Sequence, residues 1–543
     1  MRRFFLTGLI ILMVFDTAAQ IGFKFAAVAA APAGFDAGWL GRLLVEKWIY
    51  LAVLGYLGAF ATWMTLLRHA PVGPAFAASH LEIVSVLLFS VLVLGESLSG
   101  AQALGSLLIL CGIGLLTPRG ERERKEKVEP RRWRELPPTA GLPLRWRDFL
   151  PMRGAGLDFE TAFARFLNVP AVQVECSGTA CLLIALETLK RLSTRRTVVV
   201  PAYTCPLVPM AVARAGLRIR LCDTRKDRFD LDPDALSAVC DSDTLCIVPT
   251  HLGGAAADLA PTLEIARRVG AAVVEDAAQS LGAVWQGRFV GTIGEIGFYS
   301  LARGKGLTLY EGGVLVSRDA SLRRALAETA RGLVPPRPLF EWVRLTQLIG
   351  YRLGYHPAAL RLTYGFPLRY WLKKGDPARA VGDTFNRDIP LHRMGAWRKR
   401  IGAAALQRFP VAVLENAERG RRRAKRLENV PALRVINDSP PDGGTWPFLT
   451  VLFETNEACD LALSRLWTSG LGVTRLFIHD LTGYPDLRGI VSAGPMPNAS
   501  SLAERCLTIT NSAWLSENEF SRICNILADA TSNPAAGSKL ISH

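Results

Sequence analysis

Four predominantly apolar segments in the first 117 residues constrain this chain more than any other feature. They cover residues 4–31, 48–67, 71–94 and 100–117, and each is close to the roughly 20 residues that a helix needs to cross a bilayer. A cleaved signal peptide is the alternative for the first segment, but three more apolar segments follow it and no small-residue cleavage site ends it. We therefore expect an all-α unit of four transmembrane helices over residues 1–117.

Positive charge indicates how this unit lies in the membrane, because Lys and Arg gather in short cytoplasmic loops. Arg2 and Arg3 precede the first segment, and Arg68 separates the second from the third. The tail after the fourth segment is the most basic part, with Arg119, Arg122, Arg124, Lys125, Lys127, Arg131, Arg132 and Arg134. Arg42 and Lys47 favour the opposite orientation, but the tail outweighs them. We expect a multi-pass protein of the inner (cytoplasmic) membrane, with everything after residue 117 in the cytoplasm.

The overall charge fits a membrane surface better than a nucleic acid. The 543 residues carry a formal net charge of +16, without a sequence signature of a DNA- or RNA-binding fold. Residues 118–141 combine alternating charges with several prolines, which is typical of a linker lying near lipid headgroups. The ten cysteines include no CxxC pair and no zinc-type spacing with histidine, which predicts reduced thiols and no structural metal.

Polar residues inside the first apolar segment form a candidate membrane site. Asp16, Gln20 and Lys24 are four residues apart and share one helical face, and intramembrane ionisable groups usually handle substrates, ions or protons. The alternative is that Asp16 and Lys24 satisfy one another or extend to the headgroups. With Ala18-Ala19-Gln20 and Leu94-Gly95-Glu96, the unit resembles the EamA-like drug/metabolite transporter superfamily, in particular small multidrug resistance proteins and aminoarabinose-lipid flippase subunits. Four spans need a partner to form a path, so we expect a second small transporter subunit.

Beyond the linker, the pattern changes to that of an α/β protein. Strands are indicated at 197–200, 218–222, 245–249 and 271–274, alternating with helices at 206–215 and 261–269. This alternation predicts a mostly parallel sheet within residues 142–330. A long helix from about residue 401, strands near 433–436, 447–452 and 507–510, and a last helix over 517–528 predict a smaller α+β domain over residues 401–535.

Residues 272–313 place an acid, an amide and a lysine where chemistry is expected. Asp276 and Gln279 follow a strand end, the usual ligand position in open α/β sheets. Asp276 would keep a pyridine nitrogen protonated, and Gln279 would donate to a ring hydroxyl. Lys305 lies between two glycines, and its amine would be nucleophilic if burial lowered its pKa. Singly, Asp276 is better explained as a helix cap or surface carboxylate and Lys305 as an ordinary turn residue, but together with the phosphate motif described next they indicate a pyridoxal phosphate site.

A short segment upstream has the pattern of an anion site. Cys176-Ser177-Gly178-Thr179-Ala180 lies between an expected strand and an apolar helix, and the free N–H groups of a first helical turn bind phosphate. The alternative is that Ser177 simply caps the helix.

These motifs, with Pro201-Ala202-Tyr203-Thr204, Thr250-His251-Leu252-Gly253-Gly254 and Glu311-Gly312-Gly313, resemble the DegT/DnrJ/StrS family of sugar aminotransferases over about residues 140–530. The resemblance implies the aspartate aminotransferase type of fold (fold type I), pyridoxal phosphate as cofactor and a homodimer. By position, Lys305 resembles the lysine that holds the cofactor covalently, Asp276 the partner of the pyridine nitrogen and Gln279 the partner of the ring hydroxyl. Ser300 and the backbone of Gly178 and Thr179 resemble the phosphate ligands.

The chain departs from the family pattern at two positions. An aromatic residue usually stacks on the cofactor ring where this chain has Cys205, so either Tyr203 stacks or the ring rests on a smaller side chain. Leu391 replaces an Asn that reaches the phosphate of the partner subunit, which leaves Arg393 as a candidate for that contact. His251 lies at another strand end, where it contacts cofactor or substrate or serves only the structure.

Residues 331–400 differ most from the family. They hold 14 Lys and Arg against 4 acids, a net charge of +10, interleaved with Trp342, Tyr351, Tyr355, Tyr364, Phe366, Tyr370 and Trp371. Aromatic and basic residues together suit a membrane interface. A dimerisation or lid segment explains the same composition.

The combined pattern predicts a membrane-bound aminotransferase. We expect it to move an amino group from a donor, glutamate, to a keto-sugar that is nucleotide-linked, for cell-envelope polysaccharide or lipid modification. One alternative is a transporter whose C-terminal part is a non-catalytic sensor. Another is an enzyme that the helices merely anchor.

Overall fold

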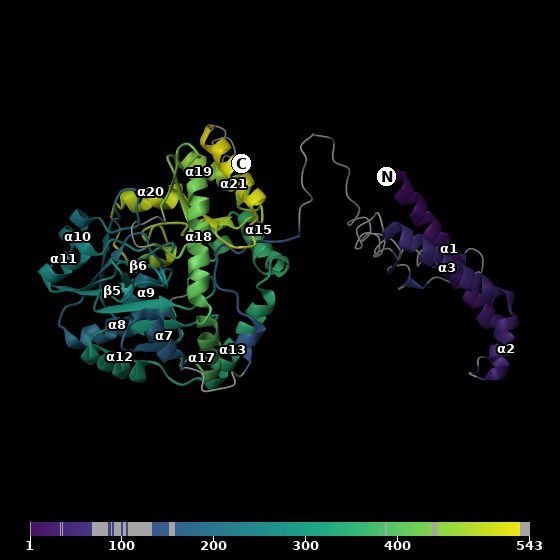
Figure 1. The fold of residues 1–543 in the computed structure, drawn as a ribbon, viewed down its shortest axis with the longest axis horizontal. Coiled ribbons are helices and arrows are strands. Elements are labelled where there is room, and N and C mark those ends of the chain that lie inside the picture. Colours follow the sequence, from purple (N-terminus) through teal and green to yellow (C-terminus); the bar gives the residue numbers. More distant parts are fainter. Residues whose placement is uncertain are drawn as a thin grey trace. The chain divides into compact units, whose positions relative to one another are not determined.

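The computed structural model of the chain describes residues 2–32, 34, 36–67, 133–150, 158–385, 388–436, 443–492 and 494–532, with isolated positions between 85 and 106. The chain divides into two compact units, Met1–Pro130 and Arg131–His543 (Figure 1).

The N-terminal unit is built on a pair of apolar helices. α1 (Arg2–Ala29) and α3 (Lys47–Leu67) pack along one another, and the short α2 (Ala37–Val45) lies between them in sequence. A Cβ atom at Gly22 would lie 2.9 Å from the backbone nitrogen of Ala52, so this glycine allows the two helices to approach closely. Ile11–Ala29 and Lys47–Thr65 are long and apolar enough to cross a membrane. They fall in the first two predicted spans, whereas residues 71–94 and 100–117 lie almost entirely outside the described residues.

The three polar residues predicted as a membrane site all lie on α1. Ala19 and Ala26 are buried on the face toward α3, whereas Gln20 and Lys24 are exposed and Asp16 is partly buried. Gln20 and Lys24 therefore lie on a face that α3 does not cover, and a role in transport stays a prediction.

A seven-stranded sheet forms the middle of the second unit. Its strands are β1 (Val172–Glu175), β2 (Thr197–Pro201), β3 (Arg218–Cys222), β4 (Thr244–Ile247), β5 (Ala272–Asp276), β8 (Ile296–Ser300) and β9 (Gly313–Val316). They lie in the order β1-β9-β8-β5-β4-β2-β3. β9 is antiparallel to both of its neighbours and the remaining pairs are parallel, which confirms the predicted mostly parallel sheet.

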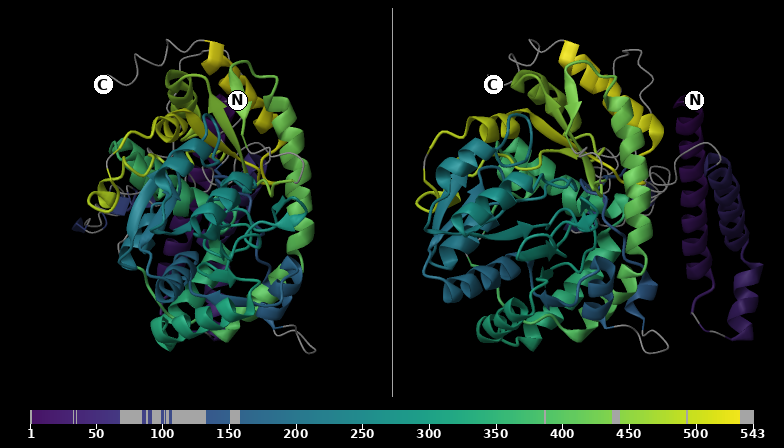
Figure 2. Two further views of the ribbon diagram at one scale, coloured as in Figure 1. Left: turned by 90° about the vertical axis from the view of Figure 1, so that its left-hand side faces the viewer. Right: turned by 60° about the vertical axis from the view of Figure 1, so that its left-hand side comes forward.

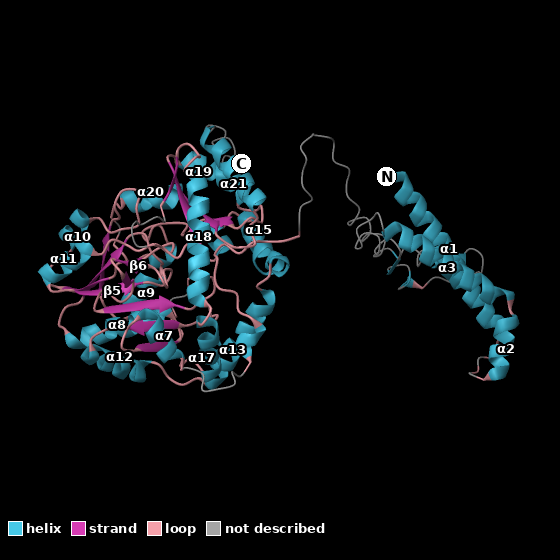
Figure 3. Ribbon diagram, in the orientation of Figure 1, coloured by secondary structure: helices cyan, strands magenta, loops and turns pink. Residues whose placement is uncertain are grey.

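Helices cover both faces of this sheet, because alternate strand residues point to opposite sides (Figure 3). Val198 and Val200 pack with α8 (Gly178–Leu192), α9 (Leu207–Arg214) and α12 (Ala320–Leu333). Val199 and Ile247 face the other way, toward α10 (Pro233–Val239) and α11 (Ala260–Val269). The remaining elements at this level are α7 (Phe159–Leu167) and the two-stranded ribbon of β6 (Val284–Trp285) and β7 (Arg288–Phe289).

The chain enters the second unit through residues 133–145, which we call the N-terminal strap; a 3₁₀ turn (Trp146–Phe149) follows it. Glu135 is 1% exposed and accepts hydrogen bonds from Arg361 at 3.3 Å and Arg369 at 2.7 Å. Arg134 pairs with Glu519, and the N–H of Leu142 donates to the carbonyl of Gly306 at 2.8 Å. The strap is thus fastened to three distant parts of the same unit.

The basic and aromatic residues 331–400 fold mainly into helices. These are α13 (Pro338–Gly354), α14 (Pro357–Leu360), a π-helical turn (Arg361–Gly365), α15 (Phe366–Lys373), α16 (Pro377–Val381) and the start of α17 (Ala396–Leu406). Several of their basic groups are paired internally, since Arg398 is fully buried against Glu341 at 2.5 Å. Trp342, Phe366 and Tyr370 remain 48–68% exposed.

The C-terminal domain combines a four-stranded sheet with flanking helices. Its strands are β10 (Leu433–Val435), β11 (Phe448–Phe453), β12 (Val473–Thr474) and β13 (Cys506–Thr510), and its helices are α18 (Phe409–Leu427), α19 (Asn456–Leu466), α20 (Pro497–Arg505), α21 (Glu517–Ser532) and a 3₁₀ turn (Pro485–Leu487). The single long helix predicted from about residue 401 is wrong, because α17 ends at Leu406 and α18 begins at Phe409. Figures 1 and 2 show α18 running from α17 to the small sheet.

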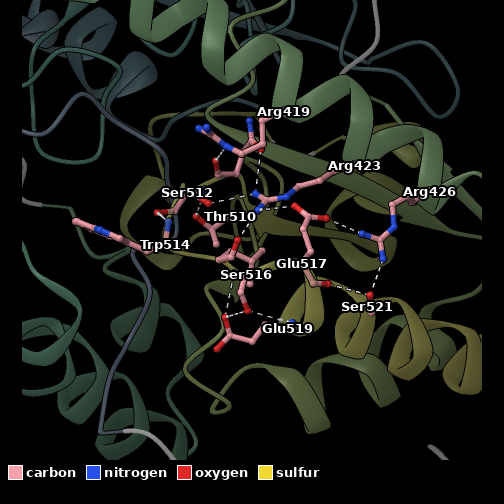
Figure 4. Close-up of polar contacts among 12 residues, drawn as sticks. Arg419, Arg423, Arg426, Thr510, Ser512, Trp514, Ser516, Glu517, Glu519 and Ser521 are labelled. Atoms are coloured by element: carbon pink, nitrogen blue, oxygen red, sulfur yellow. Dashed lines mark hydrogen bonds and ion pairs between the residues drawn. The ribbon is translucent and has the colours of Figure 1, made fainter.

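Arginine side chains of α18 bind the segment before α21 through hydrogen bonds and ion pairs (Figure 4). Arg423 is 1% exposed and donates to the carbonyls of Ser512 at 3.2 Å and Leu515 at 2.6 Å. Burial lowers the pKa of Arg423 to about 10. Arg426 pairs with Glu517 at 2.7 Å at the more exposed edge of the cluster. Within the small domain, these polar contacts therefore hold the segment before α21 against α18, in addition to the apolar core.

Candidate active site

A cavity of about 380 Å³ lies where the parallel strands of the large sheet end. It is bordered by Asp276 at the end of β5, Ser300 at the end of β8 and the first residues of α8. Seven of the predicted cofactor residues line it, namely Gly178, Thr179, Cys205, Asp276, Gln279, Ser300 and Lys305. The shared edge of the sheet brings together residues that are more than 120 positions apart in the sequence.

Lys305 reaches the cavity from a tight turn. Its N–H donates to the carbonyl of Ala302 at 3.2 Å, and Gly304 has a φ of +75°, a backbone conformation that favours glycine. Burial lowers the pKa of the Lys305 amine, although the Cys205 thiol and the Asp276 carboxylate oppose this effect. The neutral, nucleophilic form of the amine is therefore reached at a lower pH here than on the protein surface.

Asp276 and Gln279 are each held through one oxygen. Asp276 Oδ1 accepts the N–H of Ala278 at 2.9 Å, and Oδ2 has no hydrogen-bond partner within the described part of the chain. Burial raises the pKa of Asp276, while the Ala278 N–H and Lys305 act in the opposite direction. Gln279 Oε1 accepts the N–H of Gly253 at 3.0 Å, so its amide N–H groups are the ones left to donate into the cavity.

The start of α8 offers backbone donors for an anion. Ser177 Oγ accepts the N–H of Ala180 at 3.0 Å and so acts as the helix cap. Within the described residues, the N–H groups of Gly178 and Thr179 have no acceptor. A Cβ at Gly178 would lie 3.2 Å from Ser300 Cβ, so the glycine keeps Ser300 close to these donors. The Ser177 cap therefore leaves these donors free of it, and the anion site stays a prediction.

Cys205 and Tyr203 lie in different environments in the structure. Cys205 lines the cavity, and burial raises the pKa of its thiol to about 11. Tyr203 is 1% exposed and lies outside the cavity, stacked on Phe229 at 5.8 Å between ring centroids and edge-on to Phe477. The sequence left open whether Tyr203 or a smaller side chain lies against the cofactor ring. The smaller side chain, Cys205, is the one at the cavity, and the placement of Tyr203 there is wrong.

His251 is part of the scaffold beneath the cavity. It is fully buried, its Nδ1 accepts the N–H of Ala257 at 2.9 Å, and its Nε2 lies 3.1 Å from Glu275 Oε2. Glu275 also accepts the backbone N–H groups of Gly291, Ile293 and Gly294 at 2.6–2.7 Å. Because both nitrogens of His251 are engaged and it does not line the cavity, the geometry favours the structural alternative.

Arg393 lies in a different place from the cofactor residues. It borders a separate cavity of about 830 Å³, between α12 and the edge of β1, and its Nε donates to the carbonyl of Val334 at 3.3 Å. Within one chain it therefore does not meet the cofactor residues, and a contact across subunits stays a prediction.

An ionic network from α13 also reaches the cavity, and the sequence did not predict it. Glu311 lines the cavity and pairs with Arg344 of α13, while His392 Nε2 lies 3.2 Å from the same carboxylate. The part of the chain that differs most from the family thus contributes to the site. The basic–aromatic composition indicated a special segment but gave no sign of this contact.

A second cavity of about 350 Å³ adjoins the first on the side of the small domain. The two share Cys205, Gln279, Arg303 and Lys305. Residues from the small domain, among them Arg475 and Phe477, and Tyr364 from the helical segment complete its lining. Lys305 therefore borders two adjoining cavities.

Comparison with known proteins agrees with this geometry. Residues 153–334 match the DegT/DnrJ/EryC1/StrS aminotransferase family, and residues 6–117 match the EamA-like transporter family. Residues 153–334 are thus similar to aminotransferases of this family, and residues 6–117 are similar to EamA-like transporters. The helix count of the EamA-like part and its finer likeness to small multidrug resistance proteins stay predictions.

Individual relatives are similar over part of their length. An L-glutamine:2-deoxy-scyllo-inosose aminotransferase from Streptomyces kanamyceticus is 33% identical over 38% of this chain and 50% of its own. A GDP-perosamine synthase from Caulobacter vibrioides is 33% identical over 31% of this chain and 44% of its own. The chain thus spans about half the length of these curated relatives. The crystal structure of DesI in the presence of its TDP-sugar product has the same fold, with a TM-score of 0.57 and 19% identity over 75% of this chain and 96% of that one.

The family match agrees with the expected enzyme class and cofactor, and the residues present fit pyridoxal phosphate. Asp276 Oδ2, which has no hydrogen-bond partner among the described residues, suits a pyridinium nitrogen, and the Gln279 amide N–H groups suit a ring oxygen. The unused N–H groups at the start of α8 suit a phosphate. Lys305 supplies an amine whose pKa is lowered by burial.

Proposed function

We propose that this protein is a membrane-associated aminotransferase that uses pyridoxal phosphate to convert a keto-sugar into an amino sugar. The observation that carries the proposal is the meeting of Lys305, Asp276, Gln279 and the start of α8 in one cavity at the end of the parallel strands. The names of the similar proteins, which act on a cyclitol or a nucleotide-linked sugar, support a carbohydrate acceptor.

Each residue has a defined task in this scheme. When bound, the cofactor supplies a protonated pyridine ring that withdraws electrons from the carbon losing its proton. Asp276 keeps the ring nitrogen protonated, and its buried position makes this charge interaction stronger than in water. Lys305 Nζ would take the α-proton of the donor and hold it for delivery to the cofactor. The N–H groups of Gly178 and Thr179, with Ser300, hold the phosphate.

The wider setting follows from the same proposal. The amino donor is glutamate, the acceptor is nucleotide-linked, and the product serves cell-envelope polysaccharide or lipid modification. The enzyme works as a homodimer on the cytoplasmic side of the inner membrane. The exposed Trp342, Phe366 and Tyr370, within a segment of net charge +10, lie at the membrane interface or between subunits. The EamA-like domain, with a second small subunit, moves the modified product.

Absorbance spectroscopy tests the enzymatic part of this proposal. We expect detergent-purified full-length protein to show a visible band from lysine-bound cofactor that glutamate bleaches. Lys305→Ala should lose that band while retaining the far-ultraviolet circular dichroism of the wild type. If the wild type shows no band even with added pyridoxal phosphate, the domain is not catalytic and the transporter with a sensor domain becomes the better explanation.

A further inference from the structure

Two of the four cationic side chains that line the two adjoining cavities have no carboxylate within 4.0 Å among the described residues. Four cationic side chains line them: Arg303, Lys305, Arg344 and Arg475. Arg344 is paired with Glu311, and Arg475 with Asp460 at 2.6 Å. Lys305 is assigned to the cofactor. Across the described residues, Arg303 has no carboxylate within 4.0 Å, and its guanidinium makes no hydrogen bond.

Arg303 is nevertheless held in place. Its guanidinium carbon lies 5.1 Å from the centre of the Tyr310 ring, which covers one face of the cation. Its backbone N–H donates to the carbonyl of Tyr310 at 3.2 Å, so the two residues are joined through backbone as well as side chain. A guanidinium stacked in this way keeps its N–H groups at the edge, available to a ligand.

Tyr310 is itself in a costly conformation. Its φ is +70°, in the left-handed region that residues other than glycine rarely adopt, and such strain often marks functional sites. Its N–H donates to Thr308 Oγ1 at 3.1 Å. Tyr351 of α13 packs edge-on against the Tyr310 ring at 6.4 Å and stacks on Tyr355 at 4.9 Å. The helical segment thus braces the ring that positions Arg303.

The position of Arg303 indicates which anion it binds. It lies two residues before Lys305 in the same tight turn and borders both cavities, so its ligand lies beside the reacting amine. In an amino acid, the α-carboxylate is one bond from the carbon that reacts. In a nucleotide-linked sugar, the sugar ring separates the phosphate from the keto carbon. A forked guanidinium also matches a carboxylate with two parallel hydrogen bonds.

We propose that Arg303, positioned by Tyr310, binds the α-carboxylate of the amino donor. This inference rests on the proposed aminotransferase function and adds a specificity residue that lies outside the cofactor set. It also gives the α13 segment a role in donor binding, through the aromatic contacts that brace Tyr310.

The test is the concentration dependence of glutamate-driven bleaching in detergent-purified, cofactor-loaded full-length protein. Arg303→Gln should raise the half-saturating glutamate concentration by about 10- to 100-fold, the range expected for a lost charge-assisted hydrogen bond, with little change in the limiting rate. Glutarate, which has no amine to react, should compete with glutamate in the wild type and become a correspondingly weaker competitor in the variant. Inhibition by UDP should be the same in both proteins.

Two further variants and one control define the result. Tyr310→Gly removes the ring but relaxes the positive φ, so it should fold and raise the half-saturating glutamate concentration by a smaller factor, roughly 3- to 30-fold. Arg214→Gln removes an exposed arginine that borders neither cavity and should behave as wild type. An intact visible band in each variant shows that the site is folded.

The outcomes separate the two proposals. If the wild type bleaches with glutamate but Arg303→Gln has an unchanged half-saturating concentration, the role of Arg303 is refuted and the aminotransferase function stands. If Arg303→Gln weakens UDP and not glutarate, the residue binds phosphate and the inference is also wrong. If glutamate fails to bleach the wild type although the band is present, glutamate is not the donor, and the same titration with L-glutamine, which has the same α-carboxylate, tests Arg303. An equal half-saturating concentration of L-glutamine in wild type and Arg303→Gln, or no bleaching by either amino acid, then refutes the inference.

Discussion

His251→Ala should destabilise the protein without removing a substrate contact. The substitution deletes the acceptor for the Ala257 N–H and one of the four donors to Glu275, both inside a fully buried region. Each buried polar group left without its partner costs about 1–3 kcal/mol, so the expected loss in the free energy of unfolding is about 2–6 kcal/mol. Glu275 keeps its three backbone donors, which limits the loss at that carboxylate.

The assay is urea unfolding followed by tryptophan fluorescence, with His479→Ala, an exposed histidine, as the control. His251→Asn should lose less stability than His251→Ala, because its amide oxygen can replace Nδ1 as the acceptor for Ala257. At a temperature where the variants remain folded, the half-saturating concentration of glutamate should equal that of the wild type. An unchanged unfolding midpoint combined with slower bleaching in His251→Ala would contradict the structural role. It would indicate instead that His251 contacts the cofactor or substrate.

Three other substitutions test separate parts of the site and the fold. In cofactor-free protein, Lys305 should react with trinitrobenzenesulfonate with a pH midpoint below 10.5. Asp276→Asn should lower that midpoint further, because the carboxylate raises the pKa of the amine. A midpoint at or above 10.5 would show that the amine is not desolvated. Gly178→Ala brings a Cβ to 3.2 Å from Ser300 Cβ and should weaken pyridoxal phosphate binding by about tenfold in an absorbance titration, whereas Gly350→Ala, with open space around its Cβ, should not. Arg423→Met leaves the Leu515 carbonyl and Asn511 Oδ1 without their donor and should lower the free energy of unfolding by about 3 kcal/mol. A variant as stable as wild type would show that the cluster in Figure 4 adds little.

The meeting of the candidate cofactor residues in one cavity could be predicted, because it depends on local sequence and on one general property of parallel sheets. Asp276 and Ser300 end neighbouring strands, and the carboxyl ends of parallel strands meet at one edge. The choice between Tyr203 and Cys205 could not be made in this way, since it depends on packing against Phe229 and Phe477 from distant segments. The break between α17 and α18 had a signal that was available, because Pro410 stands in the first turn of α18.

The other features of the site could not be predicted, because they depend on contacts between distant segments. Nothing in the sequence around His251 reveals that residues 291–294 send three N–H groups to the carboxylate beside it. The pairing of Arg344 with Glu311 depends on where α13 packs, and the composition of that segment was equally consistent with a membrane surface. Burial, which decides the pKa directions of Lys305 and Asp276, is likewise a property of the folded chain.

The N-terminal strap determines where the second unit can be separated from the N-terminal unit. The family match begins at residue 153, and a fragment starting there would lack the whole of residues 133–145. It would leave Arg361 and Arg369 without Glu135, and it would uncover the backbone next to Lys305, since Gly141 lies against the Lys305 carbonyl. A soluble fragment that retains the site should therefore begin ahead of Arg134, and one that begins at residue 153 should purify poorly or bind cofactor weakly even though it contains every predicted cofactor residue.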